Sequence, residues 1–239
     1  MNLITGLLVS GIFFYLTSDL LKKHSLAFYV GFYAVILLMI GVNALGYYQN
    51  LSPVGKFYID LFQRGVISTS IFIIVMFIGV FTKHNKLSRT YFTIRGEMSI
   101  IACLMALTHN IIFGVVYFVN LFKNPSFMPV QVKIAAIISL ILICLMIPLF
   151  VTSFKCVRKK MKAKSWKKLQ RLAYPFFILI YIHVMLLFSM NVDKNKFSII
   201  VYTLVYVSYV VLRLRKYIIS KMKLSENMAK AKAKAKVKA

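Results

Sequence analysis

The sequence predicts an all-α integral membrane protein, a bundle of about seven transmembrane helices. Hydrophobic residues make up 60% of its 239 positions, and the mean hydropathy is +0.79, whereas soluble domains are roughly 45–50% apolar. Charged residues make up only 15% of the chain and are crowded into short segments between long charge-poor runs. Because lipid excludes charge, this uneven distribution is typical of a chain that crosses a membrane several times.

Seven charge-poor runs meet or approach the roughly 20 residues that a helix needs to cross the hydrocarbon core. These runs are 2–18, 26–48, 65–82, 98–122, 131–154, 172–190 and 197–213. The first and third are short, so their boundaries are soft. The runs are continuously apolar and lack the alternation of a membrane barrel, and only helices or barrels satisfy their backbone in lipid. Each run is therefore expected to be a helix.

Lys and Arg residues fall mainly on alternate connections. The connections after the first, third and fifth runs and the C-terminal segment hold 25 of them, the opposite side holds 6, and together these are all 31. The asymmetry predicts an N-terminus outside and a C-terminus in the cytoplasm, and we expect a multi-pass protein of a bacterial cell membrane. Because the basic residues lie between spans, we expect anionic lipid and no nucleic acid as a partner. The tail AKAKAKVKA is expected to be unstructured, with too little apolar bulk to pack.

Two of the four histidines lie near the middle of apolar runs. His109 is 12 residues beyond Glu97, and His183 is 12 residues beyond Arg171. At about 1.5 Å per residue, both lie roughly 18 Å from the predicted cytoplasmic edge. An ionisable side chain at that depth is costly and predicts a functional site.

Two imidazoles at equal depth on separate helices can face one another, as the two axial ligands of a haem iron do. Zinc or copper sites usually add Cys, Asp or Glu ligands, and the nearest such residue along the chain is Cys103. Haem is therefore the better match. The alternative is that each histidine only donates a hydrogen bond to a neighbouring helix.

The stretch from Leu149 to Leu187 resembles the ferric reductase-like transmembrane domain. That family shows a span ending in Thr-Ser, a basic connection, a Trp, a Leu-His-Arg-Leu-x-Tyr segment and then a membrane histidine. The corresponding pieces here are Val151 to Ser153, Lys155 to Lys164, Trp166, Leu169 to Tyr174, and His183. Residues 89–117 are similar to an earlier segment of the family, in which basic residues precede a span with a central histidine. The haem-bearing membrane subunit of the methionine sulfoxide reductase system is similar in size.

The resemblance implies a six-helix core with one added N-terminal helix, and it implies that His109 and His183 are the axial ligands of a haem b. We divide the chain into 1–64, with two spans and an external loop, a haem-binding core at 65–213, which could begin near 26, and a basic tail at 214–239. Two-haem members have a second histidine pair about 13 residues away, where this chain has Gly96 and Gln170. Neither residue ligates iron, so one haem is expected.

Several expectations concern electron supply. Arg95 and Arg171 are predicted cofactor-binding residues that could pair with haem propionates or with the phosphate of a flavin, FMN or FAD. Each could instead be a charge that only fixes topology, and Glu97 is a candidate partner for Arg95. No Gly-x-Gly-x-x-Gly motif or P-loop is present, so we expect no NAD(P)H domain. A separate flavoprotein or quinol would then deliver electrons to the membrane subunit of a reductase, and the acceptor would lie outside.

Two other functions remain open. The chain could be a transporter or channel-like protein in which the two histidines relay protons or bind a substrate, without haem. It could also be a membrane scaffold that works through its basic cytoplasmic face. The first alternative is weakened by the lack of carboxylates within the spans, which proton-coupled transporters often use.

Overall fold

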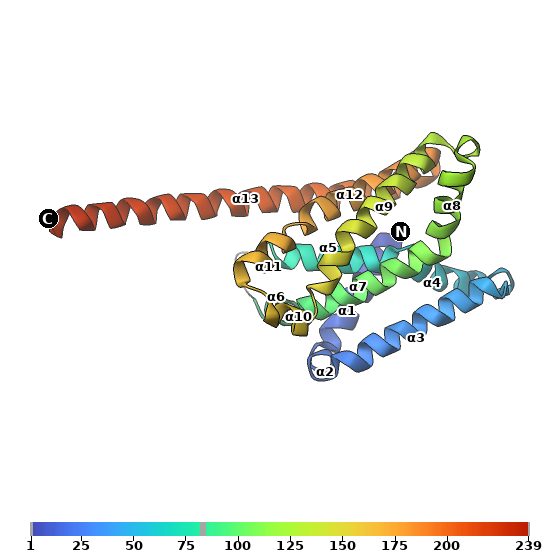
Figure 1. The fold of residues 1–239 in the computed structure, drawn as a ribbon, viewed down its shortest axis with the longest axis horizontal. Helices are drawn as coiled ribbons and strands as arrows, with labels where there is room; N and C mark the ends of the chain where they lie inside the picture. Colours follow the sequence, from blue (N-terminus) through green and yellow to red (C-terminus); the bar gives the residue numbers. More distant parts are fainter. Residues whose placement is uncertain (1, 82–84, 239) are drawn as a thin grey trace.

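The computed structural model describes residues 2–81 and 85–238, and every regular element in that part of the chain is a helix (Figure 1). The prediction of an all-α membrane protein is confirmed. Lys83 and His84, in the connection after the third predicted span, lie outside the described residues.

A helix corresponds to each of the seven predicted spans. They are α1 (Asn2–Leu16), α3 (Ser25–Ala44), α5 (Val66–Ile78), α7 (Arg95–His109) with α8 (Val115–Lys123), α9 (Val130–Val151), α12 (Ala173–Phe188) and α13 (Val192–Lys238). Judged by length and composition, four helical stretches of the described chain could cross a membrane, or five if the bent pair α4–α5 counts as one span. The membrane character is clear, and the count of seven stays a prediction.

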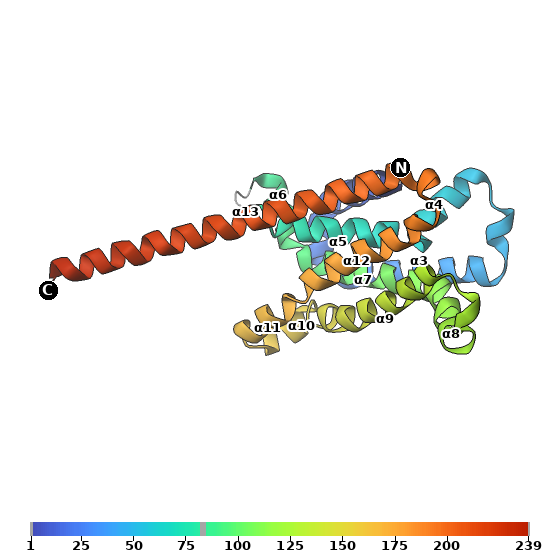
Figure 2. The same cartoon turned by 90° about the horizontal axis from the view of Figure 1, so that it is seen from above.

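Short helices cap the two ends of the bundle. At one end lie α2 (Ser18–Lys23), α6 (Lys86–Thr93), α10 (Lys155–Lys160) and α11 (Ala163–Gln170), as Figures 1 and 2 show. At the other end lie η1 (Tyr47–Asn50), α4 (Pro53–Gln63), η3 (Pro125–Phe127) and η4 (Ser189–Asn191). The connections with most of the Lys and Arg residues therefore share one end of the molecule, which we call the basic end.

Glu97 is the only acidic residue in the first turn of α7, and its side chain is paired with a residue of the basic end. Glu97 is 3% exposed, and its carboxylate pairs with the Lys155 ammonium of α10 at 2.6 Å. The expected pairing of Glu97 with Arg95 is therefore wrong. Residues two apart on a helix point to different sides, so these two side chains cannot face one another readily. The ion pair instead ties α10 to the start of α7.

The tail is helical rather than unstructured, because α13 continues to Lys238 and extends well beyond the bundle at the basic end (Figure 1). The expectation of disorder overlooked that Ala and Lys are among the strongest helix formers.

Helix α5 lies at the centre of the bundle, and eleven of its thirteen residues are buried. It packs between α1 and α7, while α9 packs along α12. The contact with α1 is close at Gly6, where an added Cβ would lie 2.5 Å from the Ser70 hydroxyl oxygen and 2.9 Å from a Val66 methyl group. Only a residue without a side chain allows α1 to lie this near α5, which lines part of the cavity around His109 and His183.

Candidate functional site

His109 is the last residue of α7, and the helix widens immediately after it. Residues Asn110–Gly114 form a π-helical turn before α8 continues the same rod. The Asn110 side chain makes two hydrogen bonds at the start of this turn. It donates to the Ala106 carbonyl at 2.9 Å and accepts from the Ser139 hydroxyl of α9 at 3.2 Å. Single π turns inside α-helices occur frequently at functional sites.

The His109 ring is oriented by a break between two other helices. Its Nδ1 lies 3.0 Å from the carbonyl oxygen of Gln63, the last residue of α4. The carbonyls of a final helical turn have no partner within their own helix, so this one is available. Because a carbonyl only accepts hydrogen bonds, Nδ1 is the donor, and Nε2 of the neutral ring is left with its lone pair.

Gly65 allows that break. Helices α4 and α5 meet at an angle of 48°, and Gly65 between them has φ +73°, in the left-handed region that favours glycine. A Cβ at Gly65 would lie 3.4 Å from Cγ of His109. The imidazole therefore rests directly against the backbone of the junction.

His183 is held in the same manner on the other side of the cavity. It lies in the second half of α12, and its Nδ1 is 3.0 Å from the carbonyl oxygen of Ala135 in α9. The same reasoning makes Nδ1 the donor and leaves Nε2 with its lone pair. Hydrogen bonding of the second ring nitrogen to a carbonyl is the usual support of a metal-binding histidine.

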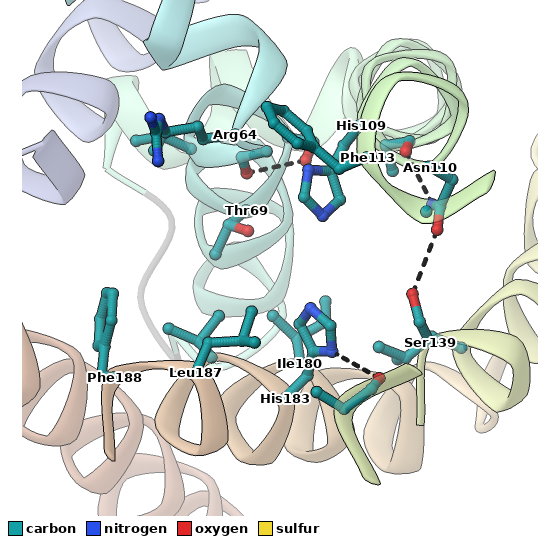
Figure 3. Close-up of a pocket in the computed structure, with 18 of the residues that line it drawn as sticks. Arg64, Thr69, His109, Asn110, Phe113, Ser139, Ile180, His183, Leu187 and Phe188 are labelled. Carbon is teal, nitrogen blue, oxygen red and sulfur yellow. Dashed lines mark hydrogen bonds between the residues drawn. The ribbon is translucent and has the colours of Figure 1, made fainter. Parts of the chain in front are cut away.

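The two rings face one another across the cavity, as Figure 3 shows. Their centres are 6.5 Å apart, and their planes are nearly perpendicular at 83°. An imidazole nitrogen binds a metal ion at about 2 Å, and the ring centre lies about 1 Å behind it, so two rings on opposite sides of one ion have centres roughly 6 Å apart. The observed separation fits a single metal ion between the two Nε2 atoms, the arrangement of a haem iron with two axial imidazoles.

A cavity of about 720 Å³ surrounds the two histidines. Most of its wall is apolar, including the labelled side chains Phe113, Ile180, Leu187 and Phe188 in Figure 3. Pockets of a few hundred to 1,000 Å³ with such walls are typical of sites for cofactors. In the described residues, no three His, Cys, Asp or Glu side chains gather as a metal cluster.

Arg64 also lines the cavity, and sequence reasoning missed it. Its Nε pairs with an Asp60 carboxylate oxygen at 2.8 Å, and its guanidinium also interacts with the Tyr48 hydroxyl. In the sequence it is one of the six basic residues assigned to the opposite side. Its position directly before the third apolar run was a signal that could have singled it out.

The other predicted residues lie elsewhere. Neither Arg95 nor Arg171 is part of the cavity wall. Arg95 is the first residue of α7, and Arg171 follows α11, so both belong to the basic end. The structure brings together His109 and His183 only.

The region where two-haem relatives have a second histidine pair is filled by other contacts. The Gln170 amide donates to the Thr152 hydroxyl at 3.1 Å, and the Trp166 indole donates to the Thr152 carbonyl at 3.1 Å. Gly96 is packed so closely that an added Cβ would lie 3.3 Å from the Ser153 carbonyl oxygen. A larger side chain at Gly96 would have to displace this backbone.

Comparison with known families finds one matching model. The family model described as "Ferric reductase like transmembrane component" matches residues 64–181, from Arg64 at the cavity through most of α12. Residues 64–181 are similar to the ferric reductase-like transmembrane family, and the match ends two residues before His183. The resemblance found in the sequence is thereby confirmed.

A relative from Treponema pallidum (strain Nichols), described as "Uncharacterized protein", shares 37% identity with this chain over 153 residues. The similarity covers 62% of this chain and 42% of the relative. The chain thus spans less than half of the length of this relative. No solved structure matches the chain.

Proposed function

We propose that this chain binds one haem b between His109 and His183 and carries electrons across the membrane as the subunit of a reductase. The observation that supports this most strongly is the pair of rings with centres 6.5 Å apart, each ring held through Nδ1 by a main-chain carbonyl. When bound, a haem supplies one-electron redox chemistry to such a site.

The residues of the chain would have separate tasks. His109 and His183 would present Nε2 from opposite sides, and the carbonyls of Gln63 and Ala135 would keep those rings from rotating. The apolar wall excludes water, which favours a macrocycle that is itself largely apolar. Arg64 could pair with a carboxylate of the porphyrin edge while it keeps its contact with Asp60.

We further propose that the electron donor and the acceptor are separate molecules. A flavoprotein or a quinol would deliver electrons from the basic end, with FMN or FAD as an additional cofactor, and the acceptor would lie on the opposite side. The charge asymmetry supports a basic end in the cytoplasm of a bacterial cell membrane, in contact with anionic lipid. Arg95 and Arg171 are at that end and remain proposed contacts of an anionic cofactor.

The first test is the visible spectrum of the detergent-purified protein, oxidised and then reduced with dithionite. We expect a low-spin b-type spectrum with about one haem per chain by pyridine haemochrome. His109→Ala and His183→Ala should each lose haem or shift it to a high-spin spectrum, because one axial ligand is removed.

His24→Ala is the matched control. His24 is an exposed histidine between α2 and α3 and is not part of the cavity wall, so this variant should keep the full haem content. If the wild-type protein were colourless after expression with ample haem supply, the haem proposal would be wrong and a transporter function would be favoured. Full haem retention in both cavity variants would show that the ligand assignment is wrong.

A further inference from the structure

Three basic side chains converge near the C-terminal end of α5. The Lys216 ammonium of α13 donates to the Gly79 carbonyl at 2.7 Å. The Arg95 guanidinium lies beside the same residue, with nitrogens 3.8 and 3.9 Å from the position of a Cβ at Gly79. Arg213, one turn before Lys216, stacks its guanidinium over the Tyr174 ring at 4.9 Å from the ring centre.

No carboxylate side chain of the protein can neutralise these three cations. The sequence has five Asp and Glu residues. Four of them, Asp19, Asp60, Glu97 and Asp193, are in ion pairs with other cations. The fifth, Glu226, is ten residues beyond Lys216 on the same helix, which places it about 15 Å away along the axis.

The end of α5 offsets only a small part of this charge. The C-terminus of a helix has the effect of roughly half a negative charge, so more than two positive charges remain uncompensated. All three side chains are partly buried, and partly buried like charges are costly unless an anion joins them. If the three residues served only to fix topology, we would expect them to separate into solvent, as Arg215 does on the exposed side of α13.

Two phenol groups lie close to the same cations. The Tyr174 and Tyr209 side chains are within electrostatic range of Arg95, and Tyr209 is 6% exposed. Phenol hydroxyls and guanidinium groups both donate hydrogen bonds to oxyanions, and arginine binds phosphate in a bidentate manner. The group is thus rich in donors of the kind that phosphate accepts.

We propose that Arg95, Arg213 and Lys216 form a phosphate-binding site between α5, α7 and α13 at the basic end. The bound group is a phosphate ester of an amphiphilic or nucleotide molecule. It comes either from the headgroup of an anionic phospholipid or from a flavin mononucleotide. The inference rests on the anionic cofactor or lipid proposed above for the basic end. The site does not involve the histidine cavity, so its test is independent of haem binding.

The test uses the purified full-length protein and two pairs of probes that differ in phosphate. Binding of FMN and of riboflavin, which lacks the phosphate, is measured by the quenching of flavin fluorescence. Retention of phosphatidylglycerol and of diacylglycerol, which lacks the phosphate, is measured by native mass spectrometry. We expect the wild-type protein to bind at least one phosphate-bearing probe and to discriminate against its phosphate-free counterpart. Preference for FMN identifies the nucleotide, and preference for phosphatidylglycerol identifies the lipid.

Arg95→Gln/Arg213→Gln is the main variant, and Arg215→Gln, which removes one positive charge from an exposed position on the same helix as Arg213, is the control. The double variant should bind the phosphate-bearing probe at least about tenfold more weakly, because two charge-assisted contacts are lost. Arg215→Gln should bind like the wild type. Lys216→Gln is the milder variant for use if the double variant does not elute as a single species. The proposal would be overturned if a folded Arg95→Gln/Arg213→Gln or Lys216→Gln variant bound the phosphate-bearing probe as tightly as the wild type. It would also be overturned if the two members of each probe pair bound equally.

Discussion

Gly65 has two tasks in the histidine cavity. It adopts a left-handed conformation between α4 and α5, and it provides the flat backbone surface on which the His109 ring rests. The Gln63 carbonyl that fixes this ring is two residues earlier in the same junction. The orientation of one proposed ligand therefore depends on a single backbone conformation.

Replacing Gly65 by alanine should weaken haem binding. An L residue in this conformation is strained by about 1–2 kcal/mol, and relief of the strain would rotate the junction and withdraw the Gln63 carbonyl from His109. We expect a lower haem content per chain and faster haem loss, measured by pyridine haemochrome and by transfer of haem to apomyoglobin.

Gly46→Ala separates this effect from general strain. Gly46 has φ +72°, and nothing lies within 4 Å of its Cβ position, so the backbone penalty is similar but no ligand is affected. This variant should unfold at a lower temperature and yet keep its haem. Equal haem loss in both variants would contradict the role assigned to Gly65.

The two histidines could be identified from sequence because their chemistry conflicts with their surroundings. A polar ring in the middle of an apolar run is expensive wherever it is placed, so His109 and His183 stood out without a structure. Arg64 did not, because a basic residue between runs is ordinary. The partners of both rings were also beyond sequence reasoning, since main-chain carbonyls 46 and 48 residues away carry no side-chain signature.

At the level of elements, helix positions were easier to predict than helix shapes. The apolar run 131–154 corresponds to α9, and 172–190 corresponds to α12, because long charge-free segments leave few alternatives. Helix α4 was missed because Lys56, Asp60 and Arg64 made its segment resemble a loop. The π turn after His109 was missed because it changes the register of a helix without changing its composition.

The close contact between α1 and α5 can be tested at Gly6. In Gly6→Ala, the new methyl group would collide with Ser70 and Val66 of α5, and overpacking of this kind costs roughly 1–3 kcal/mol. We expect a lower midpoint of thermal unfolding, followed in detergent by size-exclusion chromatography of heated samples.

Gly31→Ala in α3 is the corresponding control. Nothing lies within 4 Å of the Cβ position of Gly31, and alanine has a helix propensity better than that of glycine by up to about 1 kcal/mol. This variant should be unchanged or slightly more stable. If Gly6→Ala were as stable as Gly31→Ala, α1 would not pack on α5 as described.

On the scale of the whole molecule, the basic connections between the spans are gathered at one end of the bundle. The basic connections are distant in sequence but meet at one end (Figures 1 and 2), and the Lys155–Glu97 and Lys216–Gly79 contacts join segments from different spans there. A wrong number of spans between these connections would have divided them between both ends. The single basic end is thus consistent with the predicted alternation.

Reporter fusions test the orientation of this bundle in the membrane. Green fluorescent protein should fluoresce when it is joined to the C-terminus or inserted after Met161, between α10 and α11. Alkaline phosphatase should be active when it is inserted after Ser126, in η3 at the opposite end. These outcomes follow from the excess of Lys and Arg at the basic end. The reverse pattern, or activity of both reporters at one position, would contradict the orientation.

The main-chain support of the two histidines also bears on how the protein tolerates mutation. Side chains at Gln63 and Ala135 can be exchanged without deleting the carbonyl oxygens that hold the rings. A substitution scan along α4 and α9 would therefore find few positions where a side chain is indispensable for ligand orientation. The layer that supports the two rings would therefore be invisible to methods that look only at residue identity.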